Sequence, residues 1–402
     1  MRRIALLLAT LTCTACVTAD RLDGPPGASA AATPAGFDRP VRTDGMDRRF
    51  FEANAQASIA RVAAAATDGS IDVLALSGGG AGGAFGAGVL VGLSDAHTRP
   101  QYEIVTGVST GALIAPLAFL GPDYDDELTE AYAHGASQDL MHPFGAGALF
   151  HTAIFNGKPL RDLVNQFVDD ALVQAVAAES RNGRLLLVAT TNLDREEMVI
   201  WNMGAIAEQG GPHALALFRD VLVASASVPG VFPPVLIRVE DNGRSFQEMH
   251  VDGGASIPFF IAPDIAIALG EAPEQLHGAN VFVISNSQLG GPSHTTPFNT
   301  ISIASRSFTA VMNHMTRAAI AQTDAFAARN QMRFRFTSIP RDYQYGGSLA
   351  FDQKAMSALF DYGRRCAAAG AIWVDTQQAL ARVAMSEGRA PSADAPCPTP
   401  AS

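Results

Sequence analysis

The sequence predicts an α/β fold, a three-layer α/β/α sandwich in which helices cover both faces of a mainly parallel central sheet. Short apolar runs typical of buried strands alternate along the chain with longer stretches of helical character. Glycine-rich turns directly follow two of these runs, as is common where a strand leads into a packed helix. The 402 residues are 48% apolar and 17% charged, which is enough apolar material for one large core.

The predicted elements begin in the order strand, glycine-rich loop, helix, strand, turn, helix. The first strand is 71–76, and the helix after its loop is 84–93. The second strand is 102–106, and the helix after its turn is 112–120. We expect another helix at 47–67, before the first strand. Further strands are predicted at 184–190, 197–202, 235–239, 248–251, 281–285 and 332–337.

The N-terminal residues have the pattern of a secretory leader. Two arginines precede the apolar run 4–11, which is too short to span a bilayer, and small polar residues then lead to Cys16. This stretch resembles a bacterial lipoprotein signal, although Cys13 stands where Leu is usual. We therefore predict a signal peptide at 1–15 and lipidation of Cys16, with an ordinary signal cleaved nearby as the alternative. Such a protein would be membrane-anchored in the bacterial cell envelope and would face the periplasm.

Composition divides the remaining chain into a tether, one domain and a tail. Residues 16–45 are rich in Pro, Gly, Ala and Asp without apolar periodicity, which predicts a flexible tether. The ordered domain is predicted at 46–386, with its motif-bearing core at 71–286. The Pro-, Ala- and Ser-rich end at 387–402 is predicted to be loose.

Charge and cysteine usage exclude several classes of function. The net charge of −11 argues against nucleic-acid binding, which requires a basic surface. The sequence has no His and Cys cluster with metal-ligand spacing, so neither a metal nor another cofactor is expected. Cys366 and Cys397 either form a disulfide in an oxidising compartment or remain unpaired, and their spacing does not decide between the two.

The strongest motif is a serine between two glycines, Gly107-Val108-Ser109-Thr110-Gly111, placed between an apolar strand and an apolar helix. On a sharp strand-to-helix turn the glycines avoid backbone clashes, and the serine hydroxyl is held clear of the sheet. The positive end of the following helix stabilises negative charge that develops there. We predict Ser109 as a nucleophile supported by Gly107 and Gly111; the alternative is a tight structural turn.

The second motif is the run Ser77-Gly78-Gly79-Gly80-Ala81-Gly82-Gly83, directly after the first predicted strand. Amides in such a loop can bind a phosphate or the oxyanion of a tetrahedral intermediate. Gly78, Gly80 and Gly83 also satisfy GxGxxG, so a dinucleotide-binding loop is an alternative, as is simple close packing of the helix. The acidic residue that a dinucleotide site needs has only Glu103 as a candidate, and Glu103 does not end a second strand.

The third motif is a strand that ends in an aspartate beside two glycines, His250-Val251-Asp252-Gly253-Gly254. The glycines allow a substrate or another backbone to approach the Asp252 carboxylate. Taken alone, the pattern is typical of a turn. His250 lies two residues before Asp252, so both side chains point to the same face of a continuous strand.

Together and in this order, the three motifs resemble those of the patatin-like phospholipase family. Two further stretches are similar to segments of that family. Residues 224–234 are similar to the segment that precedes the aspartate, and residues 189–194 are similar to the end of the central strand. The resemblance runs from about residue 71 to about residue 286. It implies a patatin-like fold and a serine acyl hydrolase of esterase, phospholipase A or lysophospholipase type, without a cofactor and with a lipid or ester substrate.

The resemblance also implies a Ser-Asp dyad without histidine. In that dyad Ser109 is the nucleophile and Asp252 is the base, and Gly253 and Gly254 support the aspartate. The amides of the oxyanion hole would come from Gly78, Gly79 and Gly80. The family commonly has Arg or Lys where this sequence has Gly82, so one cationic contribution is missing and slower turnover is expected.

Two other functions remain open. A conventional Ser-His-Asp hydrolase would need His277, His294 or His314 as its base. A non-catalytic lipid-binding or envelope-interaction protein would keep the fold without the activity. Two sets of apolar residues either shape an acyl-binding site or belong to the ordinary core. They are Phe144, Leu149, Phe150, Ile154 and Phe155, and Phe232 with Pro233 and Pro234.

Overall fold

The computed structural model describes most of the chain between residues 58 and 374 and shorter stretches on either side. The described residues are 21–25, 32–44, 58–136, 140–141, 153–261, 272–291, 295–374, 376–377, 379–380, 392 and 395–398. Some of the sequence predictions fall outside these ranges. They are the signal peptide at 1–15, the lipidation of Cys16, the apolar residues Phe144, Leu149 and Phe150, and His294.

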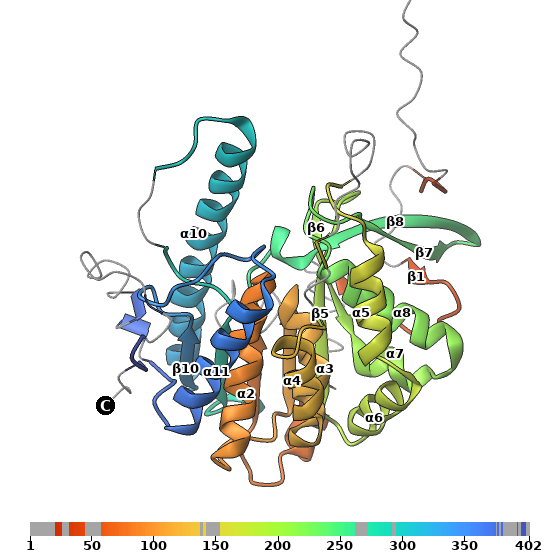
Figure 1. The fold of residues 1–402 in the computed structure, drawn as a ribbon. Coiled ribbons are helices and arrows are strands. Elements are labelled where there is room, and N and C mark those ends of the chain that lie inside the picture. Colours follow the sequence, from red (N-terminus) through yellow and green to blue (C-terminus); the bar gives the residue numbers. More distant parts are fainter. Residues whose placement is uncertain are drawn as a thin grey trace, which may run out of the picture.

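Ten strands of the described chain join in one mixed sheet (Figure 1). The strands are β1 (Thr33–Pro34), β2 (Arg42–Asp44), β3 (Asp72–Leu76), β4 (Ile104–Val108), β5 (Leu185–Asn192), β6 (Glu197–Asn202), β7 (Val235–Asp241), β8 (Arg244–Asp252), β9 (Asn280–Ser285) and β10 (Arg333–Ser338). Their order is β1-β7-β8-β5-β4-β3-β9-β10, and β6 pairs with both β5 and β2. β5, β4, β3, β9 and β10 are parallel, whereas the other pairings are antiparallel. The predicted α/β class is confirmed. The sheet is mixed and not mainly parallel as we expected, because five of the nine strand pairings in the described chain are antiparallel.

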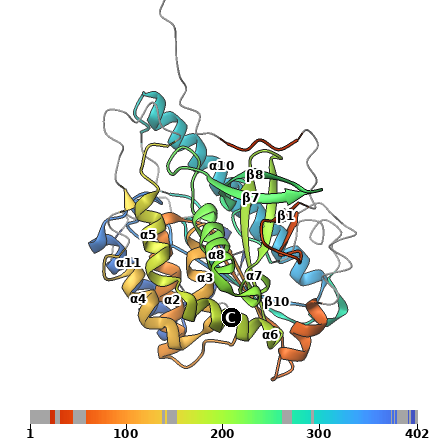
Figure 2. The same cartoon turned by 90° about the vertical axis from the view of Figure 1, so that its right-hand side faces the viewer.

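Helices lie on both faces of the sheet, which gives the three layers (Figures 1 and 2). They are α2 (Gly83–Asp95), α3 (Thr110–Leu120), α4 (Asp125–Tyr132), α5 (Lys158–Phe167), α6 (Asp170–Arg181), α7 (Met203–Gln209), α8 (Gly211–Ser225), α10 (Thr300–Arg329) and α11 (Gln353–Ala368). Short 3₁₀ helices lie at Gly80–Gly82, Pro122–Tyr124, Gly253–Ala255 and Glu274–Leu276. Within the described chain, no helix is both long enough and apolar enough to cross a membrane.

The side-chain alternation of β3 explains how the core is divided between the two faces. Leu74 and Leu76 pack into a large apolar cluster with residues of α2, α3, α8 and α11. Val73 and Ala75 point to the opposite face and pack with α10 and with the helical residues 58–65. Because β3 is buried on both faces, its sequence is a continuous apolar run rather than an alternating pattern.

Part of the predicted tether belongs to the sheet instead. Residues 32–44 contain β1, which is antiparallel to β7, and β2, which is antiparallel to β6. Phe37 and Val41 are buried there, and Arg42 of β2 forms a buried ion pair with Glu248 of β8. The prediction of a flexible tether over the whole of 16–45 is therefore wrong for this stretch, because its few apolar residues are buried by strands distant in sequence.

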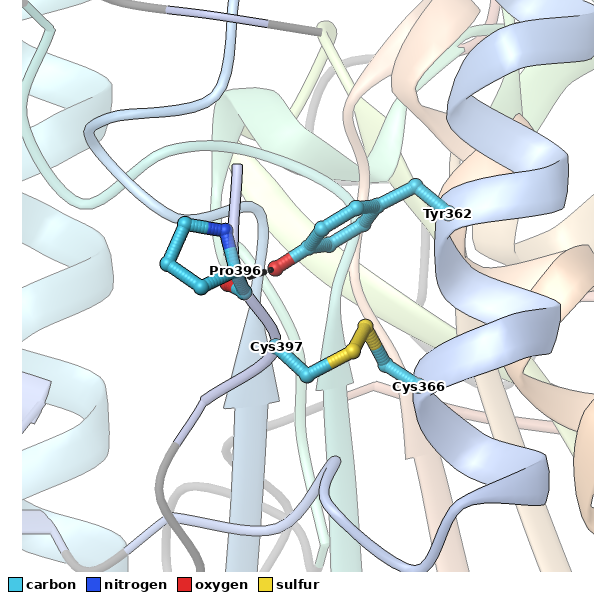
Figure 3. The surroundings of a disulfide bond; sticks show 4 residues. All are labelled: Tyr362, Cys366, Pro396 and Cys397. Atoms are coloured by element: carbon cyan, nitrogen blue, oxygen red, sulfur yellow. Dashed lines mark hydrogen bonds between the residues drawn. A yellow bond between two sulfur atoms is a disulfide. The ribbon is translucent and has the colours of Figure 1, made fainter. Parts of the chain in front are cut away.

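The C-terminal end is also attached to the domain. Cys366 of α11 and Cys397 form a disulfide, and the Tyr362 hydroxyl donates a 3.0 Å hydrogen bond to Pro396 O (Figure 3). Ala395 is buried beside them. The structure thus selects the paired state of the two cysteines. It also corrects the prediction of a loose tail for residues 395–398.

Candidate active site

Ser109 lies on a sharp turn between the carboxyl end of β4 and the first residue of α3. Its φ of 56° and ψ of −126° lie in a region that residues other than glycine rarely adopt. Cβ atoms added to Gly107 and Gly111 would lie 2.6 Å and 2.3 Å from backbone oxygens, so both positions require glycine. The turn therefore has the strained strand-to-helix geometry that the sequence motif predicted.

Asp252 reaches the same edge of the sheet from its antiparallel part. β8 ends at Asp252, which lies opposite Thr190 of β5. β5 is parallel to β4, with Ala189 opposite Val108, so the ends of β4 and β8 come together. The Ser109 hydroxyl donates a hydrogen bond of 2.6 Å to Asp252 Oδ2. Both residues are buried, with exposed fractions of 6% and 4%.

Burial strongly affects the Asp252 carboxyl. It raises the pKa of Asp252 to about 7, although hydrogen bonds from the Ser109 hydroxyl and the Gly254 N–H oppose the shift. The Gly254 N–H donates to Asp252 Oδ1 at 2.6 Å. Gly253 packs so closely on β5 that an added Cβ would lie 2.4 Å from Ala189 O. A carboxylate with a pKa near 7 is a stronger base than an ordinary aspartate and is largely ionised just above neutral pH.

Two serines of the segment 224–234 hold Ser109 and Asp252 in place. Ser225 Oγ accepts the Ser109 N–H at 3.0 Å and donates to Ala189 O at 2.7 Å. Ser227 O accepts the Asp252 N–H at 2.9 Å. The sequence indicated this segment through its resemblance to the family, but gave neither serine a role.

The glycine loop lies directly against Ser109, since a Cβ added to Gly78 would be 3.1 Å from Ser109 Cβ. The Gly78 N–H already donates to Pro258 O at 3.2 Å. This corrects the prediction that Gly78, Gly79 and Gly80 all offer amides to an anion. Among the described residues, the N–H groups of Gly79 and Gly80 have no hydrogen-bond acceptor.

The carbonyl groups that precede these two amides are each held by a hydroxyl. The Ser77 hydroxyl donates to Gly78 O at 2.7 Å, and the Tyr345 hydroxyl donates to Gly79 O at 3.1 Å. In a trans peptide the carbonyl and the following N–H point in opposite directions. Fixing the carbonyl of Gly78 therefore fixes the N–H of Gly79, and fixing the carbonyl of Gly79 fixes the N–H of Gly80.

Asn286 and Tyr345 occupy the place where a larger side chain at position 82 would lie. A Cβ added to Gly82 would be 2.0 Å from Asn286 O and 2.8 Å from the Tyr345 hydroxyl. Asn286 follows β9 and holds Ser77 twice, through its N–H on Ser77 Oγ at 2.8 Å and its side-chain amide on Ser77 O at 2.7 Å. An Arg or Lys at position 82 would clash with this arrangement. No sequence motif marked Asn286 or Tyr345.

A buried ionic network lies next to the site on β8. Glu248 pairs with Arg42, and its Oε2 lies 3.2 Å from His250 Nε2. His250 Nδ1 lies 2.9 Å from Thr190 Oγ1. Burial alone would raise the pKa of Glu248, but hydrogen bonds from His250 and Arg42 lower it to about 2. Both ring nitrogens of His250 thus have partners in the sheet.

The geometry argues against two of the alternatives. No histidine of the described residues hydrogen-bonds to Ser109 or Asp252, and His277 and His314 are exposed. Glu103 precedes β4 and accepts a backbone N–H at the start of β3 at 2.7 Å, at the opposite edge of the sheet from the glycine loop. It therefore cannot serve a dinucleotide bound at that loop. No group of His, Cys, Asp and Glu suited to a metal ion exists within the described ranges.

Comparison with known proteins identifies the family. Residues 74–263 match the family model of the patatin-like phospholipases. They form a patatin-like phospholipase domain. The crystal structure of VipD from Legionella pneumophila is similar to this chain, with a TM-score of 0.37 and 12% sequence identity over 75% of this chain and 67% of VipD. A search of curated proteins found no match.

The patatin-like phospholipase match confirms the family that the three motifs resembled, and it supports lipid acyl hydrolase activity on a lipid substrate in general. All three motifs lie within the matched residues 74–263. Asn286 and Tyr345, which hold the glycine loop, lie beyond them.

The apolar residues that the sequence offered for an acyl-binding site are only partly described. The N–H groups of Ile154 and Phe155 donate hydrogen bonds to Gly230 O and Val231 O, both at 3.0 Å. The Phe155 ring lies 6.4 Å from the ring of Phe232. A separate cavity of about 470 Å³ is lined by residues that include Phe282, Arg335 and Trp373, and neither Ser109 nor Asp252 borders it. The site is therefore identified by its chemistry and not by the size of a cavity.

Proposed function

We propose that this protein hydrolyses acyl ester bonds of lipids through a Ser109–Asp252 dyad and an acyl-enzyme. The observation that carries the proposal is the 2.6 Å hydrogen bond from the Ser109 hydroxyl to Asp252 Oδ2, made by a serine with strained backbone angles. The raised pKa of Asp252 supports its role as the base.

In the first step Ser109 Oγ attacks the ester carbonyl carbon while its proton moves to Asp252. The tetrahedral intermediate then collapses and the bond to the alcohol breaks, with the Asp252 proton passing to the leaving alcohol oxygen. In the second step water gives a proton to Asp252 and attacks the acyl carbon. The fatty acid leaves, and the proton returns to Ser109 Oγ.

Gly79 and Gly80 are the proposed donors to the oxyanion, because their N–H groups have no acceptor within the described part of the chain, whereas the Gly78 N–H donates to Pro258 O. Asn286, Ser77 and Tyr345 act as positioning residues that hold the peptide planes of these amides. This arrangement offers a physical reason for the glycine at position 82, since the loop is held by neutral hydrogen bonds where relatives commonly have a cation.

The Tyr345 hydroxyl provides a test of this arrangement. Tyr345→Phe is expected to lower kcat about tenfold with little change in KM, less than the ~10²- to 10³-fold typical of losing a direct donor. Tyr124→Phe is the matched control, because it removes a hydroxyl far from the loop. Equal kcat values for Tyr345→Phe and the wild type would contradict the positioning role.

The substrate class can be tested with purified protein and a panel of short esters, lysophospholipids and diacyl phospholipids. Release of fatty acid from at least one phospholipid class is expected, because the domain belongs to a lipid hydrolase family. If no member of the panel is hydrolysed and a fluorophosphonate probe does not label Ser109, the non-catalytic alternative is correct.

We also propose that the protein is exported and anchored in the bacterial cell envelope through Cys16. The Cys366–Cys397 disulfide supports export, because structural disulfides persist mainly in oxidising compartments. Mass spectrometry of the mature protein from its native host should find a diacylated Cys16 as the first residue, and an unmodified Cys16 would exclude the anchor.

A further inference from the structure

The N-terminal half of α10 projects beyond the body of the molecule at the edge where the parallel strands end (Figures 1 and 2). Four large apolar side chains in this region are exposed instead of packed: Phe298, just before the helix, and Ile303, Phe308 and Val311 within it. By contrast, Ile320 in the second half of the helix is fully buried against the sheet. This exposed apolar set, here called the α10 tip, has no partner among the described residues, and an apolar set of this kind marks an interaction site.

The α10 tip is amphipathic. At 3.6 residues per turn, Ile303, Phe308 and Val311 fall on one half of the helix. The opposite side carries polar residues and one arginine. They are Ser302, Ser305, Arg306, Thr309 and Asn313.

Charge separates this region from the rest of the protein. The chain has a net charge of −11, yet residues 275–323 contain no Asp or Glu and include Arg306 and Arg317. An apolar side opposite a polar side that has basic charge and no acidic residue suits a helix that lies in the interface of a membrane with anionic lipids. The charge of the α10 tip therefore complements an anionic lipid surface, whereas the acidic remainder of the protein would be repelled by it.

The α10 tip is continuous with the active site. The Met312 side chain reaches the turn after Asp252, since a Cβ added to Gly254 would lie 3.7 Å from Met312 Cε. Phe308 precedes Met312 by four residues and lies on the same side of the helix, one turn farther from the sheet. An apolar path thus leads from the proposed catalytic aspartate to the exposed end of α10.

From this juxtaposition we propose that the α10 tip docks on an anionic phospholipid surface and brings the nearly buried Ser109 next to the lipid. The inference rests on the proposed function, because it assigns the enzyme a substrate lipid that lies in a membrane interface. The binding itself does not require hydrolysis and can be measured separately.

The experiment uses the full chain with Cys16→Ser, which cannot be acylated, and Ser109→Ala, which cannot form an acyl-enzyme. Sedimentation with phosphatidylglycerol–phosphatidylcholine vesicles measures the fraction bound. Adding Phe308→Ser with Val311→Ser is expected to weaken binding about tenfold or more, because binding scales with the apolar area that enters the interface. Leu22→Ser is the matched control, since Leu22 is similarly exposed but lies on a strand-side segment away from α10.

Two further measurements test the charge. Arg306→Gln is expected to weaken binding about fivefold, and binding to phosphatidylcholine alone should be much weaker than to the mixed vesicles. Circular dichroism establishes that each variant keeps its helix content. If the double serine variant fails to fold, Arg306→Gln and the salt dependence of the parent still decide the outcome.

The proposal is overturned if the parent and the double serine variant bind the mixed vesicles equally, or if the parent binds both kinds of vesicle equally. It is also overturned if sedimentation velocity reveals a dimer that the double variant dissociates while vesicle binding stays unchanged, because a second copy then covers the α10 tip. Vesicle binding without hydrolysis by the Ser109 enzyme would refute the proposed function and leave the docking surface standing.

Discussion

Ser109→Ala is expected to lower ester hydrolysis by about 10⁴-fold or more, because no other group can replace the nucleophile oxygen. The variant should also lose labelling by a fluorophosphonate probe, which reacts only with an activated serine. Fatty-acid release and gel fluorescence measure the two effects independently.

The matched control for this variant is Ser94→Ala, which removes a hydroxyl that donates to Leu90 O within α2. It should keep both activity and labelling. Substantial hydrolysis by Ser109→Ala, or a label that maps to another serine, would move the nucleophile elsewhere.

Asp252→Asn is expected to reduce kcat/KM by about 10³-fold or more, since an amide accepts no proton from Ser109. In the wild type kcat/KM should rise with pH through a midpoint near 7, because burial raises the pKa of Asp252 to about 7 and only the ionised form acts as a base. The variant should lose this dependence together with its activity.

The same substitution should have the opposite effect on stability. The pKa of Asp252 is higher in the folded protein than in the unfolded chain, so its contribution to stability is present at low pH and is lost as the pH rises through about 7. Asn has no such cost. The unfolding free energy of Asp252→Asn relative to wild type should therefore increase from about pH 4 to pH 7 and level off above.

Histidine variants complete the test of the dyad. His277→Gln, His294→Gln and His314→Gln should each keep near-normal activity and the same midpoint of the pH profile. If one of them abolishes hydrolysis while Asp252→Asn remains active, the site is a conventional triad and the assignment of the base is reversed.

The fold and the proposed dyad were predictable because their signals are local. β3 and β4 are continuous apolar runs, and Ser109 and Asp252 each stand at the end of a strand beside glycines whose close backbone contacts require that residue. Strand ends that share a sheet edge bring distant residues together. The pairing of this serine with an aspartate 143 positions away was implied by the resemblance of the three motifs to the family, and strand ends alone did not give it.

The residues that hold the glycine loop in place could not be predicted in this way, because their roles depend on contacts between distant segments. Tyr345 lies in a stretch without regular structure, and nothing in its neighbours indicates that its hydroxyl meets Gly79 O. The engagement of the Gly78 N–H by Pro258 O depends equally on tertiary contacts. The prediction of a flexible tether at residues 32–44 was wrong for a related reason. Strands of two and three residues carry almost no periodic signal in the sequence.

The position of β9 has a consequence for where this domain can be cut. β9 separates β3 from β10, yet it begins 17 residues after the last position matched by the family, since 280 − 263 = 17. A fragment that stopped at residue 263 would expose the backbone of β3 as an unpaired edge, remove the Asn286 anchor of Ser77, and invite aggregation. The segment matched by the family is thus shorter than the unit that is needed to fold and to hold the glycine loop in its conformation.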